Sequence, residues 1–317
     1  MLSKRNSVST SEIVPYPDSN PAQQSQQPSP PPALAPAWHT IILVAAIVAL
    51  SVHSSSKLSS AHGPINRLAT YGFSALMEAL MLAWVAFGLW LKKIPFRSLL
   101  GSFSFNIPSI ALDLCIAAAF WIGALMVLGA LSLAWSLVEI ALTHTPAPAR
   151  IASQEIQARH SAMPGETKPA KEIASPKPVE QLSPAASALA NNPERIEELR
   201  TLAQLAPANG REIAAWTLLC LMVGFIEEFI FRGYLQRQFI GWARGSVAAG
   251  VCGSAVIFGA AHAYQGARGM VLIAVFGALF GLLAHHRGSL RAGIIAHGWH
   301  DWITGLALAM LKAYRIL

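Results

Sequence analysis

Charged residues are scarce in this sequence. Only 12% of its 317 residues are Asp, Glu, Lys or Arg, whereas a soluble domain carries about 25%, and 54% of the residues are hydrophobic. This composition excludes an ordinary soluble globular protein and indicates a membrane protein. The net charge of +7 arises from residues between apolar runs and not from a continuous basic face, so we expect no nucleic-acid partner.

Cysteine is rare as well, and several common sequence signals are missing. The three cysteines, Cys115, Cys220 and Cys252, lie in separate apolar runs without a CxxC pair or a metal-binding spacing, so we interpret them as small hydrophobic residues. The first apolar run begins at Trp38, too far from the N-terminus for a cleavable signal peptide. No HExxH motif is present, so any metal site would have to be assembled across several helices.

The composition changes along the chain and predicts four regions. Residues 1–37, rich in Pro, Ser and Gln, are predicted to be a disordered tail, and residues 38–142 to hold N-terminal transmembrane helices. Residues 143–204 are polar and punctuated by proline, which is typical of an extramembrane loop. Residues 205–317 are again apolar and are predicted to form a second transmembrane domain, which carries the most conspicuous intramembrane charges.

The predicted fold is an all-α polytopic transmembrane helix bundle of about seven helices, or eight if a short amphipathic helix at Glu194–Leu205 is included. The seven apolar segments are Trp38–Val52, Ala69–Leu91, Ile107–Leu142, Arg211–Gln238, Ser246–Ala263, Gly269–His285 and Leu290–Leu311. Lys and Arg in the short connections predict the orientation, because nine would lie on the side of the N-terminus and five on the other. We therefore expect a multi-pass protein of the cell membrane with a cytoplasmic N-terminus.

Two carboxylates and an arginine interrupt the fourth apolar segment, in the stretch GFIEEFIFRGYLQR. A charge inside a bilayer costs roughly 2.5–3.5 kcal/mol, so these side chains are expected to face the bundle interior or a water-filled cavity. Glu228 and Arg232 are four residues apart and can form an ion pair, whereas Glu227 points about 100° away on the helix. We predict that the pair is structural and that Glu227 faces the cavity.

Two later segments contribute further polar side chains. Phe258 and His262 are four residues apart, so the phenyl ring can pack beside the imidazole. His297 and Asp301 have the same spacing in the last apolar segment and can address a common water or ion. Together with Glu227 they predict hydrolysis by an activated water. A glutamate in a low-dielectric cavity can take a proton from water, while imidazoles can orient the water or stabilise an oxyanion.

The same residue types are also compatible with a bound metal ion. Zinc sites with three protein ligands use histidine and carboxylate side chains, so zinc is an alternative here, with His262 and His297 as ligands if a metal is bound. Two other intramembrane carboxylates, Glu78 and Asp113, have no motif around them, and we predict helix–helix hydrogen bonds for them. Small residues in the stretch GALFG, residues 277–281, predict close helix approach.

Three motifs in this order resemble a known family. EEFIFR matches EExxxR, FGAAH matches FxxxH, and HGWHD matches HxxxD/N. The three motifs lie on successive apolar segments in the second half of the chain. These motifs are those of the CAAX protease and bacteriocin-processing (CPBP) family of intramembrane proteases, also called the Abi or type II CAAX prenyl endopeptidase family. Each motif is weak alone, but three in order are specific. The resemblance covers about residues 205–305, and the first half of the chain carries none.

The resemblance implies a catalytic site composed of Glu227, His262, His297 and Asp301, in which Glu227 acts as the general base on a water molecule. Asp301 stands at the position where the eukaryotic prenyl proteases look to have Asn. Bacterial members often carry Asp there. The change keeps the role of this position and leaves its protonation state open.

Supporting roles are implied for Glu228, Arg232 and Phe258. The implied function is an intramembrane endopeptidase that hydrolyses a peptide bond of a membrane-associated protein or peptide, with CAAX-type processing of lipid-modified C-termini in relatives. The expected partners are therefore the lipid bilayer and a protein or peptide substrate. A metalloprotease and a metal-free glutamate-dependent hydrolase both stay open. The alternatives are a non-catalytic membrane scaffold or bacteriocin self-immunity protein of the same fold, and a proton-coupled transporter, which the lack of an internal repeat disfavours.

Overall fold

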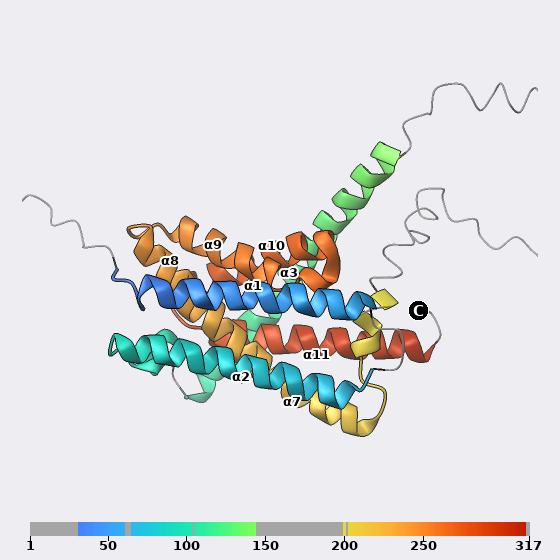
Figure 1. Ribbon diagram of the computed structural model, residues 1–317, viewed down its shortest axis with the longest axis horizontal. Helices are drawn as coiled ribbons and strands as arrows, with labels where there is room; N and C mark the ends of the chain where they lie inside the picture. The colour runs from blue at the N-terminus through green and yellow to red at the C-terminus, as the bar shows by residue number, and fades with distance from the viewer. Residues whose placement is uncertain (1–30, 61–64, 104, 144–198, 201, 315–317) are drawn as a thin grey trace, which may run out of the picture.

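A computed structural model describes residues 31–60, 65–103, 105–143, 199–200 and 202–314 of the chain. These residues form helices joined by short connections, and no β-sheet occurs among them. The helices pack side by side in one bundle (Figure 1), which confirms the predicted all-α fold. Most of the predicted tail and most of the predicted polar loop lie outside the described residues.

All seven predicted apolar segments are helical. Their bounds are α1 Ala37–Ser60, α2 Arg67–Leu91, α3 Ile107–Thr143, α7 Gly210–Glu227 with η3 Glu228–Leu235 and α8 Gln236–Trp242, α9 Val247–Ala260, α10 Gly266–Arg287 and α11 Arg291–Ala313. Two 3₁₀ turns, η2 Phe96–Leu99 and η4 Ala263–Gln265, lie in connections. Of the predicted short helix at Glu194–Leu205, residues 199–200 and 202–205 are helical, and its other residues lie outside the described ones.

Five helical stretches are long and apolar enough to cross a membrane, namely Ala37–Ser56, Arg67–Leu91, Ile107–Glu139, Gly210–Trp242 and Ala263–Arg287. The helix α9 is apolar but shorter than these spans. The helix α11 is not among the five, and it carries two histidines and an aspartate in its first half. His297 and Asp301 of the site thus lie on a helix that is not among the five, whereas Glu227, Glu228 and Arg232 lie on one that is, Gly210–Trp242.

Several helix ends lie together at one end of the bundle (Figure 1). One end, on the left in Figure 1, holds the start of α1, the end of α2, the turn between α8 and α9 and the turn between α10 and α11. Helix α7 packs against α2 and α11, α10 packs against α9 and α3, and α1 packs against α2 and α9. Segments from both halves of the chain therefore surround η3, which lies in the middle of the bundle.

Local capping interactions fix where several helices begin and end. The side chains of Asn66, Asn209 and Ser246 each accept a backbone N–H bond from the third residue beyond, at the starts of α2, α7 and α9. Gly288 ends α10 in a left-handed conformation with φ of 58°, which glycine adopts without steric cost. Asn209 and Ser246 thus mark the starts of two helices that carry polar motifs, α7 and α9.

The helix that carries the paired glutamates departs from α-helical geometry. Residues Glu228–Leu235 form a π-helix, and all eight of them are buried. The Phe231 carbonyl accepts the N–H of Gln236, five residues later, and also the hydroxyl of Ser254 on α9 at 2.6 Å. Insertions of π-helix within α-helices are rare and occur frequently at functional sites. The distortion lies directly after Glu227.

Candidate active site

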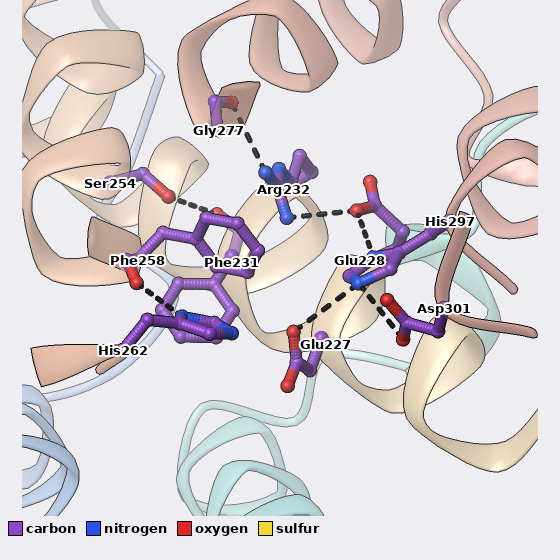
Figure 2. Close-up of polar contacts among 10 residues, drawn as sticks. All are labelled: Glu227, Glu228, Phe231, Arg232, Ser254, Phe258, His262, Gly277, His297 and Asp301. Atoms are coloured by element: carbon purple, nitrogen blue, oxygen red, sulfur yellow. Dashed lines mark hydrogen bonds and ion pairs between the residues drawn. The ribbon is translucent and has the colours of Figure 1, made fainter. Parts of the chain in front are cut away.

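Glu228 and Arg232 form the centre of a buried polar cluster in η3 (Figure 2). Arg232 Nη1 donates to Glu228 Oε1 at 2.8 Å, and their side chains are 1% and 0% exposed. Arg232 Nη2 donates to the carbonyl oxygen of Gly277 on α10 at 3.2 Å. The guanidinium carbon lies 4.3 Å from the ring centroid of Phe258 and 5.0 Å from that of Phe280. These contacts surround the cation and fit a structural ion pair.

Gly277 allows α10 to approach this cluster closely. A Cβ atom at this position would lie 2.9 Å from the Phe258 ring and 3.4 Å from Arg232 Nη2. One turn later, the carbonyl oxygen of Gly281 accepts a hydrogen bond from Gln236 Nε2 at 3.0 Å. The helix approach predicted from GALFG is therefore present, and buried polar side chains use the carbonyl oxygens of both glycines.

His297 on α11 connects the ion pair to the second glutamate. His297 Nδ1 lies 3.0 Å from Glu228 Oε1, and because an ionised carboxylate only accepts, Nδ1 is the donor. On the other side of the ring, Nε2 lies 3.5 Å from Glu227 Oε2 and 3.6 Å from Asp301 Oδ2. The imidazole is 5% exposed. Its orientation is therefore set by Glu228, and its second nitrogen can exchange a proton with Glu227 or Asp301.

His262 follows the end of α9 and approaches the site from the opposite side (Figure 2). Its Nδ1 lies 2.8 Å from the carbonyl oxygen of Phe258 and must donate, because a carbonyl oxygen has no proton. In the neutral ring, Nε2 is then a proton acceptor. The Phe258 ring lies 4.9 Å from His262 and 5.9 Å from His297, so the predicted packing of phenylalanine against the first imidazole is present. Ser51 of α1 accepts the N–H of Ala263 at 3.1 Å and holds this turn.

The two adjacent glutamates have different surroundings, as their separation around the helix predicts. The Glu228 side chain is fully buried, whereas Glu227 is 12% exposed and Asp301 is 27% exposed. Glu227 Oε2 is buried yet forms no hydrogen bond with any residue that the structure describes. A buried carboxylate oxygen without a donor is energetically costly. Glu228 Oε2 is buried without a hydrogen bond as well, but Arg232 and His297 hold the other oxygen of Glu228, and Glu227 is the more exposed carboxylate of the two.

The observed helix bounds put Glu227 and His262 at equal residue counts from one end of the bundle. The predicted bounds put Glu227 about five residues nearer to its helix end than His262, a mismatch of about 7 Å in depth. The predicted end at Gln238 is wrong, because the helix continues to Trp242. Glu227 now precedes this end by 15 residues, and His262 follows the start of α9 at Val247 by 15 residues.

Sequence reasoning missed two side chains near this site. The predicted helix–helix hydrogen bond of Glu78 is wrong, because its buried Oε2 has no hydrogen-bond partner among the described residues. Helix α2, which carries Glu78, packs against α7, which ends at Glu227. The hydroxyl of Tyr264 accepts a hydrogen bond from Gln265 at 3.2 Å, and its ring centroid lies 5.8 Å from that of His262. An unpaired carboxylate within an apolar helix was the only available signal for Glu78.

His262 and His297, the alternative metal ligands, do not converge on one ion in this arrangement. Across the described ranges, no three His, Cys, Asp or Glu side chains converge as ligands of one ion. His297 faces carboxylates with both ring nitrogens, and His262 uses Nδ1 for a backbone carbonyl. A zinc site with three protein ligands would require these contacts to be exchanged.

All seven residues named from the motifs therefore lie in one cluster. They fall between Glu227, at the end of α7, and Asp301, in the first half of α11 (Figure 2). Residues 209–303 of the chain match the family described as Type II CAAX prenyl endopeptidase Rce1-like. No curated protein and no solved structure matches the chain. The matched residues contain the EExxxR, FxxxH and HxxxD motifs on the elements that build the cluster. Through this segment, the chain is similar to the type II CAAX prenyl endopeptidases.

Proposed function

We propose that this protein is an intramembrane endopeptidase that hydrolyses a peptide bond of a membrane-associated protein or peptide with a water molecule activated by Glu227. The family supports a CAAX-type intramembrane protease. The observation that carries the mechanism is the buried Oε2 of Glu227, which has no hydrogen bond among the described residues and lies 3.5 Å from His297 Nε2. Such an oxygen is a suitable proton acceptor in a cavity shielded from bulk water.

In the proposed reaction, His262 Nε2 accepts a hydrogen bond from the attacking water and orients it, because Nδ1 already donates to Phe258. Glu227 takes a proton from this water as its oxygen bonds to the scissile carbonyl carbon. Collapse of the tetrahedral intermediate breaks the C–N bond, and Glu227 returns the proton to the leaving amine. No net proton is gained or lost by the site.

His297 and Asp301 position and polarise the reacting groups. His297 is fixed through Nδ1 by the Glu228 carboxylate, which the Arg232 guanidinium holds at 2.8 Å. Its Nε2 faces the space between Glu227 and Asp301, where a protonated ring nitrogen can donate to the developing oxyanion. Asp301 is the more accessible carboxylate and can accept a hydrogen bond from the substrate or from His297.

The substrate and location follow from the setting of the site. The five apolar helices indicate a multi-pass membrane protein. We place it in the cell membrane with a cytoplasmic N-terminus, as the distribution of Lys and Arg predicts. A lipid-modified C-terminal peptide is the proposed substrate class, because CAAX-type processing is the activity named for the family.

The test is cleavage of membrane-tethered peptides, with and without a prenylated cysteine, by purified protein in detergent. We expect Glu227→Gln to lower the rate about 10²–10⁴-fold, the usual contribution of a general base. Glu139→Gln is the matched control, because Glu139 lies in the last turns of α3, outside the cluster. Cleavage by Glu227→Gln at the wild-type rate would contradict the proposed base. No cleavage by the wild-type protein of any peptide would favour a non-catalytic scaffold or self-immunity protein.

A further inference from the structure

A polar cavity separate from the candidate active site lies at the end of the bundle where α10 ends and α11 begins. It encloses about 270 Å³ and is lined by Ser102, Phe103, Ser109, Asp113, Arg287, Ser289 and Arg291. The lining belongs to the connection before α3, to the first turns of α3 and to the α10–α11 turn. None of these residues belongs to the candidate active site.

The cavity carries more positive than negative charge. Asp113 Oδ1 accepts a hydrogen bond from Arg287 Nη2 at 2.9 Å, and Asp113 Oδ2 accepts one from Arg291. Two guanidinium groups therefore share one carboxylate, which leaves one positive charge in the lining. The Arg287 side chain is 35% exposed, whereas Arg291 is 11% and Asp113 3% exposed. Arg287 is thus the cation that an incoming anion can reach.

The wall of the cavity is preformed by backbone contacts between distant segments. Ser102 N donates to the carbonyl oxygen of Gly288 at 3.1 Å, and Leu290 N donates to that of Leu100 at 3.0 Å. Arg291 also donates to the hydroxyl of Ser109 and lies 5.3 Å from the centroid of the Phe103 ring. The donors are therefore held in place before a ligand arrives, which lowers the ordering cost of binding.

An apolar surface borders this cationic cavity. Phe105 and Ile107 follow the lining residues Ser102 and Phe103 in the sequence, and each is 82% exposed. The cavity lies where the apolar spans of α3 and α10 begin and end, which is where the hydrocarbon core meets the headgroup region. Lipid acyl chains would cover side chains of this kind, whereas a free ion in water would not.

We propose that this cavity binds the phosphate headgroup of an anionic phospholipid, with Arg287 and the serine hydroxyls on the phosphate and the acyl chains along Phe105 and Ile107. Arginine forms paired hydrogen bonds with phosphate oxygens, and basic pockets between transmembrane helices bind anionic headgroups. A single excess cation favours an anionic lipid over a zwitterionic one. The inference does not depend on the proposed peptidase activity.

The test measures binding of phosphatidylglycerol, phosphatidylcholine and inorganic phosphate to the full chain in detergent, by native mass spectrometry. Loss of a charge-assisted hydrogen bond corresponds to about tenfold or more in affinity, so we expect Arg287→Gln to weaken phosphatidylglycerol binding by that factor. Arg244→Gln is the matched control, because Arg244 is an exposed residue of the α8–α9 turn at the same end of the bundle. It should bind like the wild type.

A second variant tests the cavity without changing its charge. Ser102→Leu replaces an exposed serine of the lining with a larger apolar side chain and leaves the Asp113–Arg287 contact intact, so we expect the same loss of phosphatidylglycerol. Equal binding of phosphatidylglycerol and phosphatidylcholine by the wild type would overturn the proposal. Equal losses in Arg287→Gln and Arg244→Gln would also overturn it, because they would indicate general surface charge. Competition by inorganic phosphate as strong as that by lipid would assign the site to a free anion instead.

Discussion

Replacement of Arg232 by leucine should strongly destabilise the fold and so distinguish a structural ion pair from a catalytic one. The change removes the 2.8 Å contact with Glu228, the hydrogen bond to Gly277 and the contact with the Phe258 ring at 4.3 Å. Glu228 is then a fully buried carboxylate whose remaining donor is His297. Removal of one partner of a buried ion pair costs about 3–5 kcal/mol. We therefore expect Arg232→Leu to lower the free energy of unfolding by about 3–5 kcal/mol.

The double variant Glu228→Gln with Arg232→Leu should be more stable than Arg232→Leu alone, because the stranded charge is gone. Thermal unfolding in detergent, followed by tryptophan fluorescence, measures both. At about 2–4 °C per kcal/mol, the single variant should unfold on the order of 10 °C below the wild type. The heating rate is kept constant because unfolding of membrane proteins is often irreversible. A single variant as stable as the wild type, or a double variant that shows the summed losses, would refute the structural interpretation.

Four further predictions concern the surroundings of the site. Gly277→Val should cost about 1–3 kcal/mol in the same unfolding assay, because even a Cβ atom would lie 2.9 Å from the Phe258 ring, whereas Gly123→Ala, with nothing within 4 Å, should be neutral. Glu78→Gln should lower peptide cleavage about tenfold or more with unchanged stability, since the buried Oε2 has no hydrogen bond to lose within the described residues; an unchanged rate would leave this carboxyl outside the reaction. Asp301→Asn should keep cleavage within about tenfold of wild type and Asp301→Leu should abolish it, because the amide retains a hydrogen-bond acceptor near His297 Nε2; equal rates in the two variants would contradict this role. A metal chelator should leave the cleavage rate unchanged, because both His297 nitrogens already face carboxylates, and a rate that falls with chelator and returns with zinc would contradict this expectation.

The motif residues could be predicted because their spacing encodes geometry. An i,i+4 separation places two side chains on one helix face, and this holds for Glu228 with Arg232 and for Phe258 with His262 in the structure. Charges within apolar helices also predict a shared interior site, since few other places in a bilayer tolerate them. The link from His297 to Glu228 joins helices 69 residues apart, and no local pattern specifies such a contact.

The π-helical segment could not be predicted, because it depends on partners distant in the sequence. The second bond to the Phe231 carbonyl comes from Ser254 on α9, and the Phe229 ring stacks on Phe96 of η2 at 3.9 Å between centroids. Helix periodicity alone assigns this stretch to a regular α-helix and ends it at Gln238. Likewise, nothing in the sequence around Glu78 identifies the element that it faces.

The N-terminal helices, which carry no motif, complete the environment of the catalytic segment. The hydroxyl of Tyr234 in η3 lies 2.9 Å from His39 Nδ1 and 2.8 Å from Thr40 Oγ1, both on α1, and all three side chains are buried. Gln238 Nε2 donates to the carbonyl oxygen of Ala35 at 2.8 Å, just before α1. Unpaired buried polar groups cost about 1–3 kcal/mol each, so removal of α1 would strand several of them beside the π-helix.

The segment that matches the family is supported by helices that lie outside it. The family match covers residues 209–303, yet the turn that carries His262 is held by Ser51 of α1, and α2, which carries Glu78, packs against α7. A site whose geometry must be held within fractions of an ångström loses its orientation when such supports are removed. The helices without motifs therefore supply packing around Glu227 and the hydrogen bond that holds the turn of His262.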